Sequence, residues 1–436
     1  MDKKNNKKIG FIPLSFNMAE TGRAIVIAKQ IKKLGFNPVF FSHGGEYEYL
    51  IQESGFKINQ VKPLFTKELQ NHIVRVNRGE KKGLPYSQSF IRAAVKEEIK
   101  AFKEKNIEMI VSFVNLTTSI SARVMKIPLI FVSPLPGRFF LKIPDNYENV
   151  FSRFIPQKIK LNVLNYSFEK SKKYLKPFNK IAKEYGLKPF NSSMDLVRGD
   201  YNLGINFLEF LNIFPNQQIY SDKDYVGISS FENIFSDKFT NTEKKEINNK
   251  INKHFSKKTN KILITMGSSG DKNFLINMLK ALNNTNYRVI VLYANILNEK
   301  EITNFKENIL FIKFVPSIEY LHNNVDLSVI HGGQGTVYSA AYAGKPVIGF
   351  PMNFEQHLNL EKIVGHGSGF LLSKKYFDEK VFLKTINKIF KNYEKYLKNA
   401  KKLADKLPPP NGDINAARRI IEIYKECKVN RWAANH

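Results

Sequence analysis

Short apolar runs alternate with amphipathic segments along this chain, and the alternation begins twice. Residues 9–16 form an apolar run typical of a buried strand, and residues 22–34 follow with their apolar positions at helical spacing. Strands that alternate with helices favour a parallel sheet covered by helices, so we predict an α/β fold. The second half of the chain repeats the pattern with strand-like runs at 261–270, 287–293, 308–315 and 327–333.

The length of the chain predicts two domains. A chain of 436 residues exceeds what one ordinary hydrophobic core accommodates. Residues 231–260 are highly charged and hold few large apolar side chains, so we predict a linker there. The expected divisions are a first Rossmann-like lobe at 1–230, this linker, a second lobe at 261–412 and a final helix at 413–436. Asp413 is the expected cap of that helix.

The net charge of +29 predicts attraction to anions. Anionic lipid, nucleic acid and phosphorylated small molecules would all be attracted by such a charge. The lysines are spread along the whole chain, which also fits a bias of composition with no function. No nucleic-acid-binding motif is present, so we expect no nucleic acid partner and leave an anionic membrane surface open.

The absence of a targeting signal from the sequence and its single cysteine favour a cytoplasmic location. The first apolar stretch contains Pro13 and Ser15 and is too short and broken for a signal peptide. No run of about 18 apolar residues occurs, so no transmembrane helix is expected. Cys427 is the sole cysteine, which excludes an internal disulfide and a cysteine-based metal site. We therefore expect a cytoplasmic protein, with association to the membrane periphery left open.

Two further segments each leave alternatives. Residues 138–174 mix bulky aromatic and basic side chains, as an interfacial membrane segment, a wall of an acceptor pocket or ordinary core would. Asp222 and Asp224 form a DxD pair of carboxylates of the kind that can bind a metal ion. They lie in a polar turn, so we interpret them as surface residues and expect no metal site.

The densest chemical signal lies at residues 331–359. A buried strand leads into a glycine-rich turn, and a helix of small residues follows the turn. Such a turn lets the backbone approach a ligand closely and presents free N–H groups at a helix start, which suits a diphosphate. The residues expected there are His331, Gly332, Gly333, Gly335 and Thr336.

Two more loops follow predicted strands and are expected at the same end of the sheet. Gly267, Ser268 and Ser269 follow one strand, and Glu355 and Gln356 follow another. Because ligands of open α/β sheets bind outside the carboxyl ends of the strands, these loops could converge on one ligand. His331 could donate to a phosphate or stabilise a leaving diphosphate.

The stretch from His331 to Asn359 resembles the signature of the UDP-glycosyltransferase family, which has the two-lobed GT-B fold. The resemblance implies two lobes that face each other across a cleft and a final helix that crosses back to the first lobe. It places Gly267, Ser268, Ser269 and the Gly332–Thr336 turn at the diphosphate. It places the backbone near Phe314 and Val315 at the nucleobase, and Glu355 and Gln356 at the donor sugar. Asn359 also matches the pattern.

The chain departs from the family in both lobes. Ser339 stands where the family usually has a glutamate that grips the ribose. Arg23 stands where many relatives have a histidine base, and the aspartate that orients this base is absent. An arginine stays protonated, so it is no base. Glu20, on the same loop, is the best candidate for the base, and His43 is an alternative. Arg23 could hold Glu20 or bind an anionic group.

These features predict an inverting, metal-independent glycosyltransferase. The donor would be a nucleoside-diphosphate sugar, most simply a UDP-sugar, which acts as a co-substrate, so no cofactor is expected. The acceptor would be a hydroxyl of a lipid or small hydrophobic molecule. A sugar-nucleotide epimerase on the same fold and a non-catalytic sugar-nucleotide- or lipid-binding protein are the alternatives.

Overall fold

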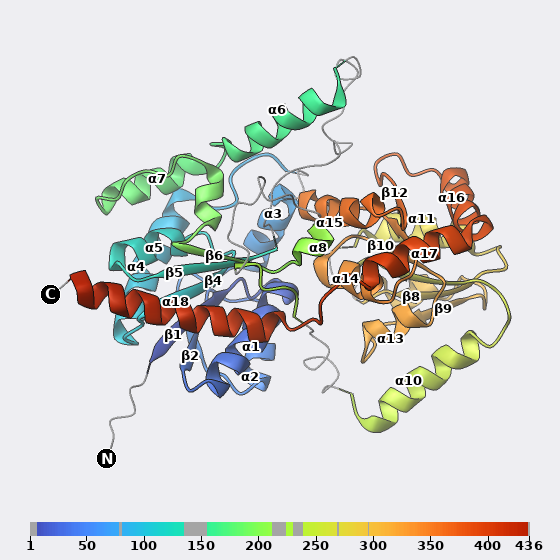
Figure 1. The fold of residues 1–436 in the computed structure, drawn as a ribbon, viewed down its shortest axis with the longest axis horizontal. Coiled ribbons are helices and arrows are strands. Elements are labelled where there is room, and N and C mark those ends of the chain that lie inside the picture. Colours follow the sequence, from blue (N-terminus) through green and yellow to red (C-terminus); the bar gives the residue numbers. More distant parts are fainter. Residues whose placement is uncertain are drawn as a thin grey trace.

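Two parallel sheets form the framework of the molecule and lie side by side in the computed structural model (Figure 1). Each sheet has six strands, and every pairing within them is parallel. The predicted α/β fold with two Rossmann-like lobes is confirmed. The structure describes residues 7–77, 81–134, 155–211, 224–229, 239–267, 270–294 and 296–434.

The first sheet has the strand order β3-β2-β1-β4-β5-β6. Its strands are β1 (Lys8–Pro13), β2 (Asn37–Ser42), β3 (Ile58–Gln60), β4 (Met109–Phe113), β5 (Leu129–Ser133) and β6 (Tyr201–Gly204). The helices of this half are α1 (Met18–Lys33), α2 (Glu48–Glu53), α3 (Lys67–Asn77), α4 (Gln88–Glu104), α5 (Thr118–Met125), α6 (Gln157–Glu169), α7 (Leu175–Glu184), the 3-10 helix at Ser193–Val197 and α8 (Leu208–Leu211).

Helices bury both faces of the first sheet. On one face, Phe11 and Phe40 pack in a cluster with Ala24 of α1. On the other face, Phe41 and Phe131 pack with apolar side chains of α4 and α5. Burial on both faces explains why these strands are continuous apolar runs in the sequence rather than alternating ones.

The second sheet has the strand order β12-β11-β10-β7-β8-β9. Its strands are β7 (Lys261–Thr265), β8 (Arg288–Leu292), β9 (Ile309–Ile312), β10 (Leu327–Ile330), β11 (Val347–Gly349) and β12 (Gly369–Leu371). Its helices are α10 (Asn241–His254), α11 (Lys272–Leu282), α12 (Glu299–Ile302), α13 (Ile318–Asn323), α14 (Gln334–Tyr342), α15 (Phe354–Gly365), α16 (Glu379–Lys391) and α17 (Tyr393–Ala404).

The interval predicted to be a linker contains a helix of the second lobe. Helix α10 begins at a capping box in which Thr240 and Glu243 satisfy each other's backbone N–H groups. Ile251 and Phe255 are buried in a cluster with Leu263 of β7. The linker prediction is therefore wrong for residues 241–255, because one apolar side chain per helical turn is enough to attach this charged helix to the sheet. Residues 231–238 lie outside the described part of the chain.

The carboxy-terminal helix leaves the second lobe and lies along the first. Figure 1 shows α18 (Gly412–Ala434), in red, beside α1. Its Ala416, Ala417 and Ile420 are buried in the same cluster as the strands of the first sheet. Gln30 of α1 donates a hydrogen bond to Asp413 at 2.8 Å. No helix among the described residues is long and apolar enough to span a membrane.

Candidate active site

The strand order places a topological switch point in each sheet. In the first sheet β1 lies between β2 and β4, and in the second β7 lies between β8 and β10. Ligands of open parallel sheets bind at the carboxyl ends of the strands beside such a point. The turn after β1 leads to Glu20 and Arg23, the turn after β7 contains Gly267, and the turn after β10 begins with His331. The candidate residues thus come from the switch points of both lobes.

The buried imidazole of His331 lies between two glycines. A Cβ added to Gly267 would lie 2.6 Å from the Cε1 of His331, and one added to Gly333 would lie 2.5 Å from its Nε2. Both separations are far below van der Waals contact, so neither position accepts a side chain without displacing the ring. The loops after β7 and β10 therefore meet at this histidine. Ser268 and Ser269 lie outside the described residues.

The turn after β10 is supported by the start of α15. Gly332 has a φ of +94°, and a Cβ there would lie 2.6 Å from the carbonyl oxygen of Gln356. The Nδ2 of Asn359 donates to the carbonyl of Gly332 at 3.1 Å. The Oε1 of Gln356 accepts from the N–H of Met352 at 2.8 Å. These two amides, of which the resemblance places Gln356 at the donor sugar, hold the backbone of the site in this structure.

The amino-terminal end of α14 faces open space. Its first intrahelical bond runs from the N–H of Val337 to the carbonyl of Gly333 at 3.0 Å. The N–H groups of the three preceding residues have no acceptor within the helix. Gly335 is exposed, and a Cβ added there would meet nothing within 4 Å. Thr336 is half-buried beside it. Room for an anion therefore exists where the helix dipole favours one.

A carboxylate lies beside the serine that replaces the usual glutamate. The hydroxyl of Ser339 is 3.3 Å from the Oε1 of Glu319 and 2.9 Å from the carbonyl of Gly335, and it donates to one of them at a time. The hydroxyl of Ser317 donates to the Oε2 of Glu319 at 3.2 Å. The sequence analysis missed Glu319, because its partner Ser339 lies on a different helix.

The two nucleobase candidates precede α13. Phe314 has half of its surface exposed, so its ring is accessible to a planar ligand. Val315 packs against the apolar cluster that includes Ile251 and Phe255. The backbone between them leads directly into Ser317, the cap of α13. The segment expected at the nucleobase and the carboxylate of Glu319 are therefore neighbours.

The first lobe contributes an ion pair that reaches the second lobe. The guanidinium of Arg23 donates to the Oε2 of Glu20 at 2.8 Å, and both side chains are buried. Its other terminal nitrogen donates to the Oε1 of Gln334 at 3.0 Å. Arg23 thus holds Glu20, as one of the sequence interpretations proposed, and connects it to the first turn of α14.

Gln334 is a second residue that the sequence analysis missed. Its Nε2 donates to the carbonyl of Ile205 and to the Oδ1 of Asn206, the latter at 3.1 Å. The hydroxyl of Tyr338 donates to the same Oδ1 at 3.0 Å. The segment after β6 therefore joins α14 to the first lobe. The sequence did contain one signal for this role. Gln334 places a long polar side chain between Gly333 and Gly335, although a tight glycine turn does not require a polar side chain there.

Glu355 faces this ion pair from the second lobe. Burial raises the pKa of the Glu355 carboxyl above its ordinary value of 4.5, and the negative charge of Glu20 raises it further. The positive charge of Arg23 and a hydrogen bond from Asn359 (3.3 Å) oppose this shift. The predicted acceptor-lobe and donor-lobe carboxylates therefore influence each other electrostatically.

His43 is not available as a base. One ring nitrogen lies 3.0 Å from the carbonyl oxygen of Pro63, and the other lies 2.9 Å from the Oε1 of Glu98. Both ring nitrogens are therefore engaged by buried groups of the protein. Glu98 also accepts from Asn115, Thr117 and Ser121. The alternative base of the sequence analysis is therefore wrong, because this buried network occupies both nitrogens.

Metal-binding groups do not gather in the described ranges. No cluster of three or more histidine, cysteine, aspartate or glutamate side chains that could hold a metal ion occurs there. Asp224 accepts from the Nε of Arg419 at 3.0 Å and so attaches α18 to the first lobe. Asp222 lies outside the described residues.

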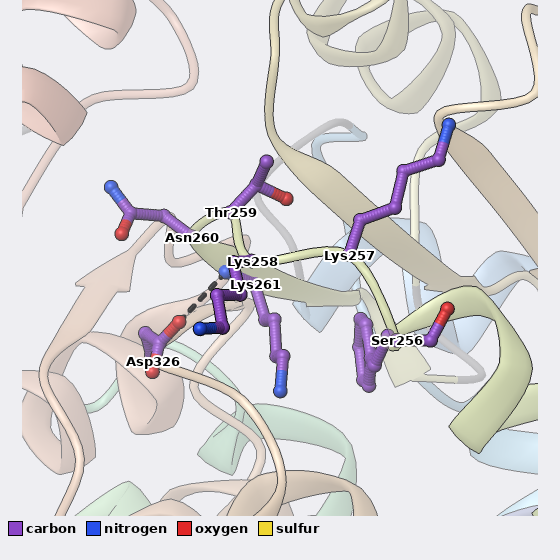
Figure 2. Close-up of a pocket in the computed structure, with 8 residues that line it drawn as sticks. Ser256, Lys257, Lys258, Thr259, Asn260, Lys261 and Asp326 are labelled. Atoms are coloured by element: carbon purple, nitrogen blue, oxygen red, sulfur yellow. Dashed lines mark hydrogen bonds between the residues drawn. The ribbon is translucent and has the colours of Figure 1, made fainter.

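A surface hollow of about 340 Å³ lies at the opposite end of β7 from the candidate site (Figure 2). It is lined by the loop 255–261 and by Asp326, which accepts from the backbone N–H of Lys261 at 2.8 Å. Because Lys261 is the first residue of β7, the hollow lies at the amino end of the strands. It is therefore separate from the switch points described above.

The chain is similar to known glycosyltransferases. Residues 242–409 match the glycosyltransferase family 28 C-terminal domain. The chain is 24% identical over 417 residues to a PGL/p-HBAD biosynthesis glycosyltransferase of Mycobacterium tuberculosis, covering 92% of this chain and 89% of that protein. It is 22% identical to a PGL/p-HBAD biosynthesis rhamnosyltransferase of Mycobacterium bovis, covering 98% of this chain and 91% of that protein. The solved structure of glycosyltransferase VinC in complex with DTDP is similar with a TM-score of 0.61, at 13% identity, covering 96% of this chain and 100% of that one.

Fold and likeness together define the class of the protein. Two facing Rossmann-like lobes with candidate residues at both switch points are the GT-B arrangement, and the similar proteins of nearly full length are glycosyltransferases. This chain is a glycosyltransferase, and its second lobe matches the carboxy-terminal domain of glycosyltransferase family 28. The predicted enzyme class is confirmed.

Proposed function

We propose that this enzyme transfers a sugar from a nucleoside-diphosphate donor, in the first instance a UDP-sugar, to a hydroxyl of a lipid or small hydrophobic acceptor, with inversion. The observation that carries the proposal is the open amino-terminal end of α14 next to His331. Backbone N–H groups without an intrahelical acceptor, the helix dipole and an imidazole lie there together. This combination suits the negative charge of a diphosphate.

The second lobe would stabilise the leaving group. As the bond between the anomeric carbon and the diphosphate breaks, negative charge grows on the diphosphate oxygen. We expect the first-turn N–H groups of α14, the hydroxyl of Thr336 and the ring of His331 to donate hydrogen bonds to this oxygen. These groups need no metal to act, so the proposed reaction is metal-independent and uses no cofactor beyond the nucleotide sugar.

The first lobe would supply the base. In a single displacement, the acceptor oxygen forms its bond to the anomeric carbon while the bond to the diphosphate breaks on the opposite face. The hydroxyl proton passes to the Glu20 carboxylate. The bond from Arg23 to Gln334 supports this role, because it holds Glu20 at the boundary with α14. Glu355 would accept hydrogen bonds from the sugar hydroxyls on the donor side.

The nucleotide is proposed to be bound by the segment around α13. Phe314 would contact the base, and Glu319 with Ser339 would contact the ribose. UDP is the first candidate because the residues at 331–359 resemble those of UDP-sugar enzymes. The complex of VinC with DTDP makes a thymidine diphosphate donor the natural comparison.

The acceptor side is proposed to work at an anionic membrane surface. The net charge of +29 favours contact with anionic lipid. An acceptor with an apolar body would be presented there to the first lobe.

Calorimetry with UDP, dTDP and GDP tests the donor site, and a transfer assay tests the base. We expect Glu20→Gln to retain nucleotide binding and to lower turnover about a hundredfold or more. We expect His331→Ala to weaken diphosphate binding. Glu104→Gln, an exposed carboxylate on α4 of the same lobe, is the matched control. If no nucleoside diphosphate binds the wild-type protein, the proposal is wrong. If the enzyme isomerises the nucleotide sugar when no acceptor is present, its activity is epimerisation and not sugar transfer.

A further inference from the structure

Helix α6 carries a stripe of exposed apolar side chains. Ile159, Val163 and Tyr166 are 53%, 62% and 67% exposed, and Ile155, one turn before Ile159, is 44% exposed. At about 100° per residue, the three helical positions fall within an arc of about 60°. Single exposed apolar residues are ordinary on protein surfaces, but a continuous row on one helix marks an interaction surface. We call these four residues the α6 stripe.

The α6 stripe is not the face by which the helix packs on the protein. Leu164 lies about 100° further round than Val163 and is buried. Leu161 is half-buried on the same side. The helix is therefore apolar on two sides, one against the first lobe and one toward solvent. Figure 1 shows α6 at the outer edge of the first lobe, extending beyond α7.

Basic side chains border the α6 stripe. Lys158 and Lys160 lie about 100° to either side of Ile159 around the helix. Residues 155–176 contain six lysines and one acidic residue, Glu169. The carboxylate of Glu169 is 2.7 Å from a terminal nitrogen of Arg198, so its charge is already paired. The surface around the stripe is thus strongly positive.

We propose that the α6 stripe docks the enzyme onto an anionic lipid bilayer, with the apolar side chains entering the boundary between headgroups and acyl chains and the lysines contacting the headgroups. This inference rests on the proposed function, since it identifies the surface that brings the first lobe to a membrane-borne acceptor. Apolar area and attraction to anionic lipid together set the strength of such binding.

The charge around the stripe favours a lipid surface over a protein partner. Lysines are depleted at the centres of protein interfaces. Anionic headgroups match the basic borders of the stripe.

Co-sedimentation of the full chain with vesicles tests the proposal. We expect binding to vesicles that contain phosphatidylglycerol, weak binding to pure phosphatidylcholine, and loss of binding at high salt. The double variant Val163→Ser/Tyr166→Ser should lower the partition coefficient about tenfold or more, because two apolar side chains no longer leave water. The matched control is Val381→Ser/Tyr376→Ser on the second lobe, where the original side chains are 52% and 65% exposed. This control should bind like the wild type.

Other outcomes overturn the proposal. Equal loss in both double variants, equal binding to neutral and anionic vesicles, or no vesicle binding by the wild type would each do so. A wild-type dimer that becomes monomeric in the α6 variant, without vesicle binding, would assign the stripe to a second copy of the chain. Nucleotide binding, measured by calorimetry on the same samples, should not change in either variant. If the wild type does not bind nucleotide, the proposed function is wrong. The vesicle measurements would then still test whether the α6 stripe binds lipid.

Discussion

The guanidinium of Arg23 donates to the side-chain oxygen of Gln334 at 3.0 Å, although 311 positions separate the two residues. The same guanidinium pairs with Glu20 at 2.8 Å. One arginine therefore links the proposed base on the first lobe to the helix end that is proposed to bind the diphosphate. The arginine that stands where the resembling family has a histidine contacts both groups in this structure.

Replacing Arg23 by alanine should be strongly destabilising. The change leaves the buried carboxylate of Glu20 without its guanidinium partner, and breaking a buried pair in this way costs about 3–5 kcal/mol. Urea unfolding measures the loss. Arg92→Ala is the control, because Arg92 and Glu184 form an exposed pair whose loss should change stability little. Similar effects of the two variants would contradict the role of Arg23.

Replacing Arg23 by lysine should separate stability from activity. A lysine keeps the positive charge but lacks the planar fork that reaches Glu20 and Gln334 together. We expect a folded protein with kcat reduced about tenfold or more, since small misplacement of a catalytic group has effects of this size or larger. Steady-state kinetics with saturating donor measure it. Wild-type kcat in this variant would show that the link between the lobes does not position Glu20.

Replacing Gly335 by alanine should raise stability and lower donor affinity. Gly335 is helical, and a Cβ added there would meet nothing within 4 Å. Alanine should therefore raise the free energy of unfolding by about 0.5–1 kcal/mol, because its helix propensity is better than that of glycine. The new methyl group enters the space proposed for the diphosphate. Thermal unfolding and calorimetry with UDP measure the two effects. Unchanged UDP affinity in a stabilised variant would place the diphosphate elsewhere.

Glycines that contact His331 provide the contrast to Gly335. Gly333→Ala places a Cβ 2.5 Å from the ring and should lower both stability and diphosphate affinity. A loss of affinity without any loss of stability at this position would contradict the packing described here.

Replacing Glu319 by glutamine should weaken UDP more than dTDP. A charged acceptor contributes about 1.5–3 kcal/mol to a hydrogen bond, so loss of the carboxylate should lower UDP affinity about tenfold. The deoxyribose of dTDP lacks the 2′-hydroxyl and serves as the internal control. Titration of both nucleotides into wild type and variant gives the comparison. Equal weakening of the two would mean that Glu319 does not contact that hydroxyl.

Much of the framework could be predicted from the sequence. Parallel strands buried on both faces are continuous apolar runs, so strands such as β1, β7, β8 and β10 were visible. The sequence analysis missed β3, β6 and β12, because these strands have only three or four residues and are partly exposed. The turns at Gly267 and His331 were visible because tight approaches require glycine. Helix α10 was missed because its charged residues outnumber the apolar ones, although Ile247, Ile251 and Phe255 recur at a spacing of four.

The contacts between distant residues could not be predicted. Gln334 acquires its role only when Arg23 and Asn206 are placed beside it, and no local pattern of polarity or spacing encodes that approach. Glu319 is missed for the same reason, since it reaches Ser339 from the neighbouring helix. The α6 stripe was partly visible as a mixture of aromatic and basic residues, but burial was needed to show which face points outward.

Replacing Glu355 by glutamine should raise stability at neutral pH and lower activity. The pKa of the Glu355 carboxyl is raised above 4.5 in the folded state. At pH values between 4.5 and this raised pKa, the folded state therefore binds more protons than the unfolded state. Stability therefore falls as pH rises through this window, and glutamine removes the loss. We expect the variant to unfold at a higher temperature than wild type at about pH 7.5, with little difference at about pH 4.

The Glu355→Gln variant should also lose activity, because its contact with the donor sugar is weakened. A neutral amide is a weaker acceptor than a carboxylate, so transfer should fall about tenfold if Glu355 accepts hydrogen bonds from donor hydroxyls. Glu246→Gln, an exposed change in the middle of α10, is the control for both measurements and should alter neither. A stability gain in the Glu355 variant that is equal at both pH values would contradict the electrostatic explanation. Full activity in the same variant would remove Glu355 from the donor site, because the carboxylate is the group that distinguishes it from glutamine.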